Sequence, residues 1–208
     1  METGTVVILW IAALAGTYLL GSVPFGIIVG RGCCRIDPRE SGSGNTGATN
    51  VARSCGTIYG LLVLTLDLLK GLIPTWLAML ASGSWVMISL IALAAVAGHV
   101  FSVFLKFKGG KGVATAIGVF IPVAFCPLLI SAVLCVLAIA GSRFVSVGSL
   151  LLFTSLPILI IVFWKIQFLP LALVVMILIY WRHRDNIVRL LNGQEKKWRD
   201  RSGQDTMI

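Results

Sequence analysis

The chain has 208 residues, of which 58% are hydrophobic and only 12% are charged, whereas soluble globular domains carry about 25% charged residues. Its mean hydropathy is +0.98. Too few polar side chains remain to cover a water-soluble surface, and the same composition excludes disorder, collagen-like structure and a disulfide scaffold. The sequence therefore predicts an integral membrane protein that forms one domain over residues 1–208.

Long runs without charge mark the predicted membrane spans. A helix needs about 20 mostly apolar residues to cross a hydrocarbon core roughly 30 Å thick, and lipid cannot hydrogen-bond the free backbone groups of other structures. We expect the first three spans at residues 5–29, 57–79 and 85–105. The first run lacks a basic n-region and continues straight into Pro24, so we interpret it as a retained span and not as a cleaved signal peptide.

The next charge-free run, residues 112–142, predicts a short helical hairpin that turns between Pro122 and Pro127, because proline breaks helices. Two further apolar runs follow at residues 144–164 and 166–181. With the hairpin, the chain has seven transmembrane helices. The alternative is five, with residues 144–181 forming one crossing and a re-entrant piece.

Nearly all basic residues fall in three segments, residues 31–53, 106–111 and 182–201. The positive-inside rule places all three in the cytoplasm. We therefore expect an all-α, multi-pass membrane protein with its N-terminus outside and its C-terminus in the cytoplasm. The polar loops that can carry chemistry then share one face of the membrane.

The first basic segment contains the sequence SGSGNTGATNVAR at residues 41–53. Glycine permits close backbone approach, so successive N–H groups can converge on an anion, and an arginine offers a planar fork that suits phosphate. The alternative is a flexible polar connector. We favour an anion site and expect the following residues in it: Gly42, Ser43, Gly44, Asn45, Gly47 and Arg53.

The second segment, KFKGGKGVAT at residues 106–115, lies between two apolar runs. The N-terminus of the helix that follows has free N–H groups and a dipole that favour phosphate. It is not a Walker A loop, because no Ser or Thr follows Lys111 directly. The alternative is an anchor for anionic lipid head groups. We favour a phosphate cradle formed by Lys108, Gly109, Gly110, Lys111 and Gly112.

The third segment begins with RHRDN at residues 182–186. His183 and Asn186 are three residues apart, hence on one face of a helix. A histidine beside arginines at the membrane edge can bind an oxyanion or transfer a proton. The alternative is a set of cations that extend to the lipid head groups.

Polar residues inside the apolar runs predict one buried ion pair and no metal site. Asp67 and Lys70 are three apart and are expected to pair, because an isolated charge in a bilayer is costly. His99 is expected to be buried and hydrogen-bonded. The five cysteines form no C-x-x-C pair and have little histidine nearby, so we expect ordinary reduced thiols and no zinc.

The polar segments at residues 41–53, 106–115 and 182–186, in this order, resemble the motifs of the bacterial acyl-phosphate:glycerol-3-phosphate acyltransferase family. The members of this family are integral membrane enzymes that acylate the sn-1 position. The resemblance extends to residues 21–26, 67–71 and 98–115 and so covers nearly the whole chain. It implies seven membrane helices with the active site at the cytoplasmic interface. By motif position, it implies functional roles for Ser43, Arg53, Lys111, His183 and Asn186. The sequence departs from the family at residue 185, where it has Asp in place of the usual Glu.

The resemblance also implies the reaction. A fatty acyl group is transferred from acyl phosphate to the sn-1 hydroxyl of glycerol 3-phosphate, which gives 1-acylglycerol 3-phosphate (lysophosphatidic acid) and phosphate for phospholipid biosynthesis in the bacterial inner membrane. No cofactor, metal, nucleic acid, acyl-carrier protein or CoA is expected, and membrane lipids are expected partners. The sequence contains no G-x-S-x-G and no H-x₄-D motif. The alternative is a small membrane transporter of a phosphorylated anion or lipid.

Overall fold

The computed structural model describes residues 3–198, and every regular element in this range is helical. The long helices are α1 (Thr3–Ser22), α4 (Thr57–Ala81), α5 (Trp85–Val100), α7 (Phe125–Ser142), α8 (Val145–Val162) and α9 (Leu169–Arg182). The short ones are α2 (Phe25–Cys34), α3 (Ala48–Cys55), α6 (Val113–Val123) and α10 (Arg184–Leu191), with single 3₁₀ turns η1 (Val103–Leu105) and η2 (Ile166–Phe168).

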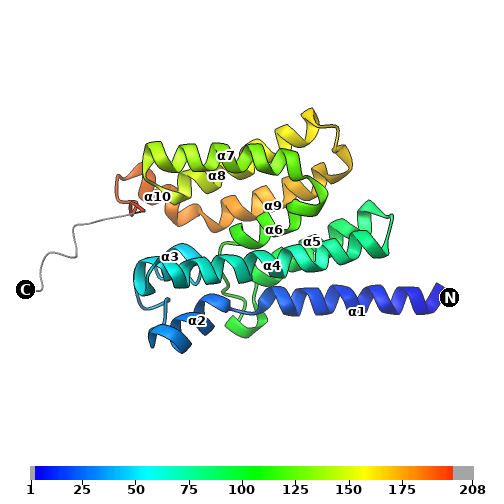
Figure 1. Ribbon diagram of the computed structural model, residues 1–208, viewed down its shortest axis with the longest axis horizontal. Helices are drawn as coiled ribbons and strands as arrows, with labels where there is room; N and C mark the ends of the chain where they lie inside the picture. Colours follow the sequence, from blue (N-terminus) through cyan, green and yellow to red (C-terminus); the bar gives the residue numbers. More distant parts are fainter. Residues whose placement is uncertain (1–2, 199–208) are drawn as a thin grey trace, which may run out of the picture.

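The long helices run side by side along the longest axis, and α2, α3 and α10 gather at one end (Figure 1). The start of α1 lies at the opposite end. Within the described residues, five helical segments are long and apolar enough to cross a membrane, and a sixth is obtained if the bent pair α9 and α10 is counted. The protein is therefore an all-helical, multi-pass membrane protein.

The first predicted span, residues 5–29, is confirmed, because residues 4–34 together are long and apolar enough to cross a membrane. Within this span, α1 ends at Ser22 and α2 starts at Phe25. Pro24 between them has no backbone N–H and cannot continue the ladder of α1. The second and third predictions agree with α4 and with α5 followed by η1.

The predicted hairpin in residues 112–142 is confirmed. α6 ends at Val123 and α7 begins at Phe125, so the chain turns at Ala124 between the two prolines. The end of α7 returns to the basic end, where the N–H of Trp198 donates to Arg143 O at 2.8 Å. α6 has only 11 residues, about half the length of a full crossing, and the count of seven spans stays a prediction.

The last apolar run begins with η2, continues as α9 and bends by 57° into α10. α9 packs between α8 and α5, where its Ile179 is completely buried together with Val96 and Phe153. This packing fixes the position at which α9 ends, and so the position of His183, which immediately follows.

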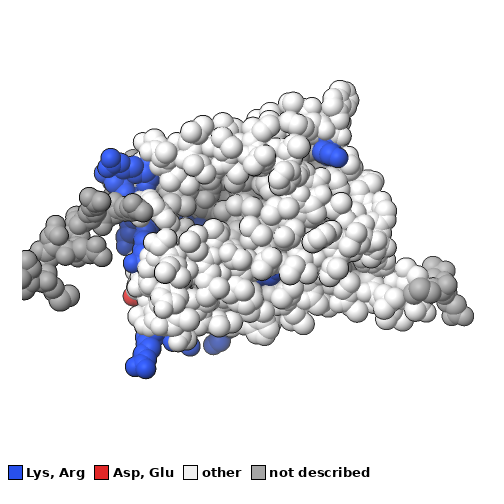
Figure 2. Space-filling view, in the orientation of Figure 1, with Lys and Arg blue, Asp and Glu red and all other residues white. Residues whose placement is uncertain are grey.

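Basic side chains gather at one end of the molecule, around α2, α3 and α10, while most of the remaining surface on the face shown carries no charged side chain (Figure 2). Hydrogen bonds join the three basic segments there: Arg182 donates to Gly109 O at 2.5 Å, and Lys196 donates to Gly42 O at 2.5 Å. The three segments therefore meet at one end, as the charge pattern predicts. The last part of the third segment, including Arg201, lies outside the described residues.

Candidate active site

A cavity of about 320 Å³ lies where the three basic segments meet. Six cationic side chains line it against a single carboxylate, that of Asp185, so its field attracts anions. The lining residues are Arg39, Ser43, Gly44, Asn45, Thr46, Lys108, Gly109, Lys111, Trp181, Arg182, Arg184, Asp185, Asn186 and Arg189.

The shape of the first loop is set by one buried amide, that of Asn50 in the first turn of α3. Its Oδ1 accepts from Ser43 N at 2.7 Å. Its Nδ2 donates to the carbonyl oxygens of Pro38, Asn45 and Ser41 at 2.6, 2.8 and 3.1 Å. Gly44, at the tip, has φ of +70°, a conformation that residues with a side chain rarely adopt. The loop that carries Ser43 is therefore wrapped around a single side chain.

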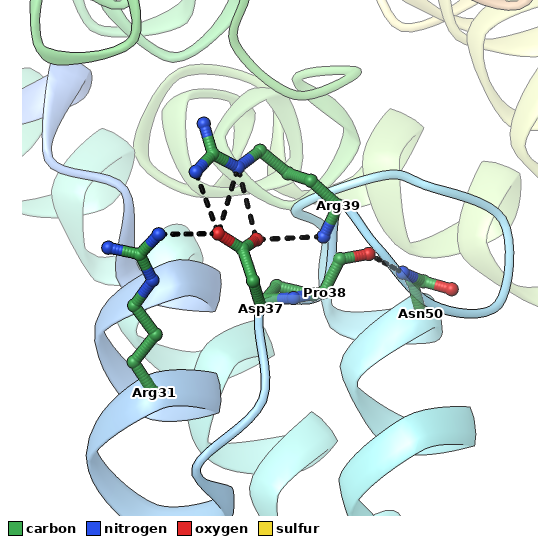
Figure 3. A network of polar contacts seen from close by, with 5 residues as sticks. All are labelled: Arg31, Asp37, Pro38, Arg39 and Asn50. Carbon is green, nitrogen blue, oxygen red and sulfur yellow. Dashed lines mark hydrogen bonds and ion pairs between the residues drawn. The ribbon is translucent and has the colours of Figure 1, made fainter.

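Arg39 enters the cavity wall from an ion-pair network at the start of the same loop (Figure 3). The Arg39 and Arg31 guanidinium groups each approach Asp37 Oδ2 to 2.7 Å, and the Arg39 N–H also donates to Asp37. The hydrogen bonds from Arg39 hold the pKa of the Asp37 carboxyl well below its usual range. The carboxylate therefore stays charged and orients Arg39 at neutral pH.

The glycines of the second loop hold the loop against the end of α5. Gly109 N donates to Val100 O and Gly110 N to His99 O, both at 3.1 Å. On the other side, Arg182 donates to the carbonyl oxygens of Gly109 and Gly110. The peptide groups of Gly109 and Gly110 are thus bonded within the protein, and the second loop lines the cavity with Gly109 and with the two lysines, Lys108 and Lys111.

A chain of polar contacts runs from the second loop to the C-terminal segment. Lys111 Nζ donates to Asn186 Oδ1, and Asn186 Nδ2 donates to Glu195 Oε1 at 2.6 Å. Ser146 and Arg189 also donate to this carboxylate, at 2.8 and 2.9 Å. Burial alone would raise the pKa of Glu195, but these hydrogen bonds outweigh it and the pKa is lowered. Glu195 is therefore an anionic anchor for Asn186.

Lys111 is the most strongly perturbed cation of the cavity. Burial lowers its pKa to about 8, with a further contribution from the neighbouring arginines and an opposing one from Glu195. A bound anion would relieve this cost, because opposite charge favours the protonated amine. An anionic ligand therefore stabilises the protonated form of Lys111 more than it would stabilise that of an exposed lysine.

His183 lies at the bend between α9 and α10 and is only 2% exposed. Its Nδ1 lies 2.8 Å from Ile179 O, and since a carbonyl oxygen only accepts, Nδ1 must carry the proton. Burial and the nearby charge of Lys111 lower its pKa to about 4. The ring is therefore neutral at pH 7, with Nε2 as an acceptor.

The structure brings seven of the predicted site residues to the cavity wall: Ser43, Gly44, Asn45, Lys108, Gly109, Lys111 and Asn186. Six others do not line it: Gly42, Gly47, Arg53, Gly110, Gly112 and His183. Arg53 instead donates to the backbone oxygens of Lys196 and Lys197, at 3.2 and 3.1 Å. Gly112 caps α6 against apolar side chains of the core.

Sequence reasoning assigned no role to three residues that shape the site. Asn50 stands in the first motif, but nothing in its spacing distinguishes a buried amide from an exposed one. Arg39 and Glu195 lie outside the motifs, and no local pattern marks them. Among the described residues, no group of three or more His, Cys, Asp or Glu is arranged to hold a metal ion.

Comparison with known proteins gives concordant matches. A model of the glycerol-3-phosphate acyltransferase family matches residues 11–193. The glycerol-3-phosphate acyltransferase of Desulfovibrio desulfuricans is 55% identical over 191 residues, which cover 92% of this chain and 84% of that protein. The corresponding protein of Lawsonia intracellularis is 49% identical over 192 residues, which cover 92% and 96%.

Solved structures are also similar. The crystal structure of PlsY (YgiH), an integral membrane glycerol 3-phosphate acyltransferase, in its glycerol 3-phosphate form has a TM-score of 0.87 at 41% identity. The match covers 90% of this chain and 94% of that one. The lysophosphatidic acid form gives a TM-score of 0.84 at 40% identity over the same shares.

Proposed function

The chain belongs to the glycerol-3-phosphate acyltransferase family, and we propose that it transfers a fatty acyl group from acyl phosphate to the sn-1 hydroxyl of glycerol 3-phosphate. The products are 1-acylglycerol 3-phosphate and inorganic phosphate. The observation that carries this proposal is the cavity in which six cations face one carboxylate at the meeting point of three loops. Both substrates carry a phosphate group, and both phosphates need such a site.

The chemistry requires positioning more than covalent help from the protein. Acyl phosphate is a mixed anhydride with a good leaving group. The sn-1 oxygen attacks the acyl carbon, the bond from that carbon to the bridging oxygen breaks, and the phosphate leaves with the bonding electron pair. The hydroxyl proton passes to a phosphate oxygen held beside it. Charge neutralisation and orientation supply the rate enhancement.

The residues of the cavity divide this work. Lys111 neutralises phosphate, because its depressed pKa recovers when an anion binds beside it. Ser43 and the Asn45 amide supply donors from the first loop. Asn186, anchored by Glu195, keeps Lys111 aimed at the cavity. Lys108 and the arginines that line the cavity add positive charge to that of Lys111.

His183 and Arg53 act on the site from behind its wall. The Nδ1–H of neutral His183 is hydrogen-bonded to the end of α9. We therefore propose that His183 orients the third segment and is not the general base. Arg53 holds residues 196 and 197, and Lys196 in turn donates to Gly42 O. Arg53 therefore fixes the first loop relative to the C-terminal segment.

For the membrane we propose seven crossings in the bacterial inner membrane, with α6 and α7 as the hairpin and the whole chain as one domain. The clustering of cations at one end supports a cytoplasmic position for the cavity. The N-terminus then lies outside. The acyl chain would lie between the helices or in the surrounding lipid.

The test is donor specificity of the purified protein in detergent. Palmitoyl phosphate, palmitoyl-CoA and palmitoyl acyl-carrier protein are each mixed with glycerol 3-phosphate, and release of phosphate and of the acylated product is followed. Of the three donors, we expect only acyl phosphate to give the acylated product. We also expect that phosphate is released only when glycerol 3-phosphate is present. Equal or greater rates with either thioester would overturn the proposed donor.

A further inference from the structure

Three ionisable side chains form a buried cluster beside the cavity, and the reaction described above assigns them no role. Asp67 and Lys70 of α4 pair with Oδ1 and Nζ 2.7 Å apart, and His99 Nδ1 of α5 lies 3.7 Å from the same Asp67 oxygen. No side chain of the three is more than 7% exposed. Ionisable groups in apolar surroundings are costly to keep and therefore point to a role.

His99 connects two helices to the loop that carries Lys111. Its Nδ1 lies 3.1 Å from Thr115 Oγ1, in the first turn of α6. Its backbone oxygen accepts from Gly110 N at 3.1 Å. The ring also lies directly against Gly110, since a Cβ added to that glycine would be 2.2 Å from His99 Nε2. The imidazole is therefore the surface on which the second loop rests.

Lys70 connects the same cluster to the first loop. Its Nζ donates at 3.0 Å to Val23 O, at the break between α1 and α2, and lies 5.6 Å from the centre of the Phe25 ring. One residue further along, Gly26 is so close to Thr46 that an added Cβ would clash with its carbonyl oxygen. Thr46 lies in the first loop and lines the cavity.

The cluster is shielded from bulk water. It faces a space of about 10 Å³, which is also lined by Thr46 and Gly110, and such a volume admits one water molecule at most. Charge interactions in this environment are screened far less than at the surface. The geometry of the pair and of the imidazole is therefore tightly held.

We propose that Asp67, Lys70 and His99 form a positioning cluster for the acyl transfer. They touch no substrate. They hold the backbone at Gly110, and with it the neighbouring Lys111, in the conformation that the cavity requires. This proposal rests on the proposed acyltransferase activity. The two are tested separately, because the variants are compared with a wild type that is itself active.

The most selective perturbation is Thr115→Val, which removes the hydroxyl that contacts His99 and keeps the side-chain volume. A matched control is Thr75→Val: Thr75 is equally buried, but its Oγ1 donates at 2.8 Å to Gly71 O within its own helix. In glycerol 3-phosphate-dependent phosphate release, Thr115→Val is expected to lower kcat/KM at least fivefold, and Thr75→Val less than twofold. Equal losses in the two variants would overturn the proposal.

A second measurement separates positioning from a general loss of folded protein. If the cluster acts through Lys111, adding Thr115→Val to Lys111→Met lowers kcat/KM by less than a further twofold. If Thr115 has only a structural role, the two losses multiply, and the proposal fails. Should Thr115→Val not purify as folded protein, Asp67→Asn takes its place with the same two outcomes. A wild type without activity would count against the proposed function.

Discussion

Replacement of Asn50 by Asp tests whether one buried amide shapes the first loop. The two side chains have the same shape, but the NH₂ group that donates to three carbonyl oxygens at 2.6–3.1 Å becomes an acceptor that faces them. Each hydrogen bond contributes about 1 kcal/mol net, and a carboxylate buried among acceptors adds further cost. The native loop conformation is therefore disfavoured by about 3 kcal/mol or more, roughly a hundredfold in population.

The assay is initial rate of phosphate release from palmitoyl phosphate as a function of glycerol 3-phosphate. We expect kcat/KM to fall by about a hundredfold in Asn50→Asp. Asn192→Asp, at an exposed asparagine that ends α10, is the control and should retain wild-type activity. The thermal midpoint in detergent reports whether the helical bundle is intact. Activity of Asn50→Asp within threefold of wild type would refute the assigned role of the amide.

Three further outcomes follow from the site. Since the pKa of Lys111 is about 8, its protonated fraction falls as pH rises, so KM for the phosphate substrate that it binds should increase roughly tenfold between pH 8 and 9.5. Lys111→Arg, which stays charged, should show no such increase in the same steady-state assay. His183→Gln should raise KM for glycerol 3-phosphate at least tenfold with kcat within about fivefold of wild type, whereas a collapse of kcat at saturating substrate would identify a general base. Arg53→Ala should reduce the rate of phosphate release at least tenfold, whereas the control Lys165→Ala, at an exposed lysine, should not. Equal effects of the two substitutions would contradict the proposed role of Arg53 in fixing the first loop.

The distribution of charge predicted the large-scale features of the fold because burial of charge in lipid is so costly. It located the long helices, and the two prolines at residues 122 and 127 located the hairpin turn at Ala124. It did not reveal the break at Pro24, because the run continues apolar on both sides. There the constraint is a missing backbone donor, not hydropathy.

The composition of the site could be predicted only in part. Glycine, hydroxyl and basic residues in the first two loops predicted a shared anion site, and Ser43 and Lys111 line one cavity. The expectation that glycine N–H groups would cradle phosphate did not anticipate that Gly109 and Gly110 bond to the end of α5. Glu195 lies 84 residues beyond Lys111, and no local pattern encodes the meeting of such distant segments.

The central claim is that the three loops bind phosphate together in one cavity. A structure of this protein with glycerol 3-phosphate bound tests it most directly. The account predicts the substrate phosphate within hydrogen-bond distance of Lys111 or of the Ser43 loop, with the sn-1 hydroxyl open towards the helices. A phosphate bound at the opposite end of the bundle, or between helices remote from all three loops, would contradict it.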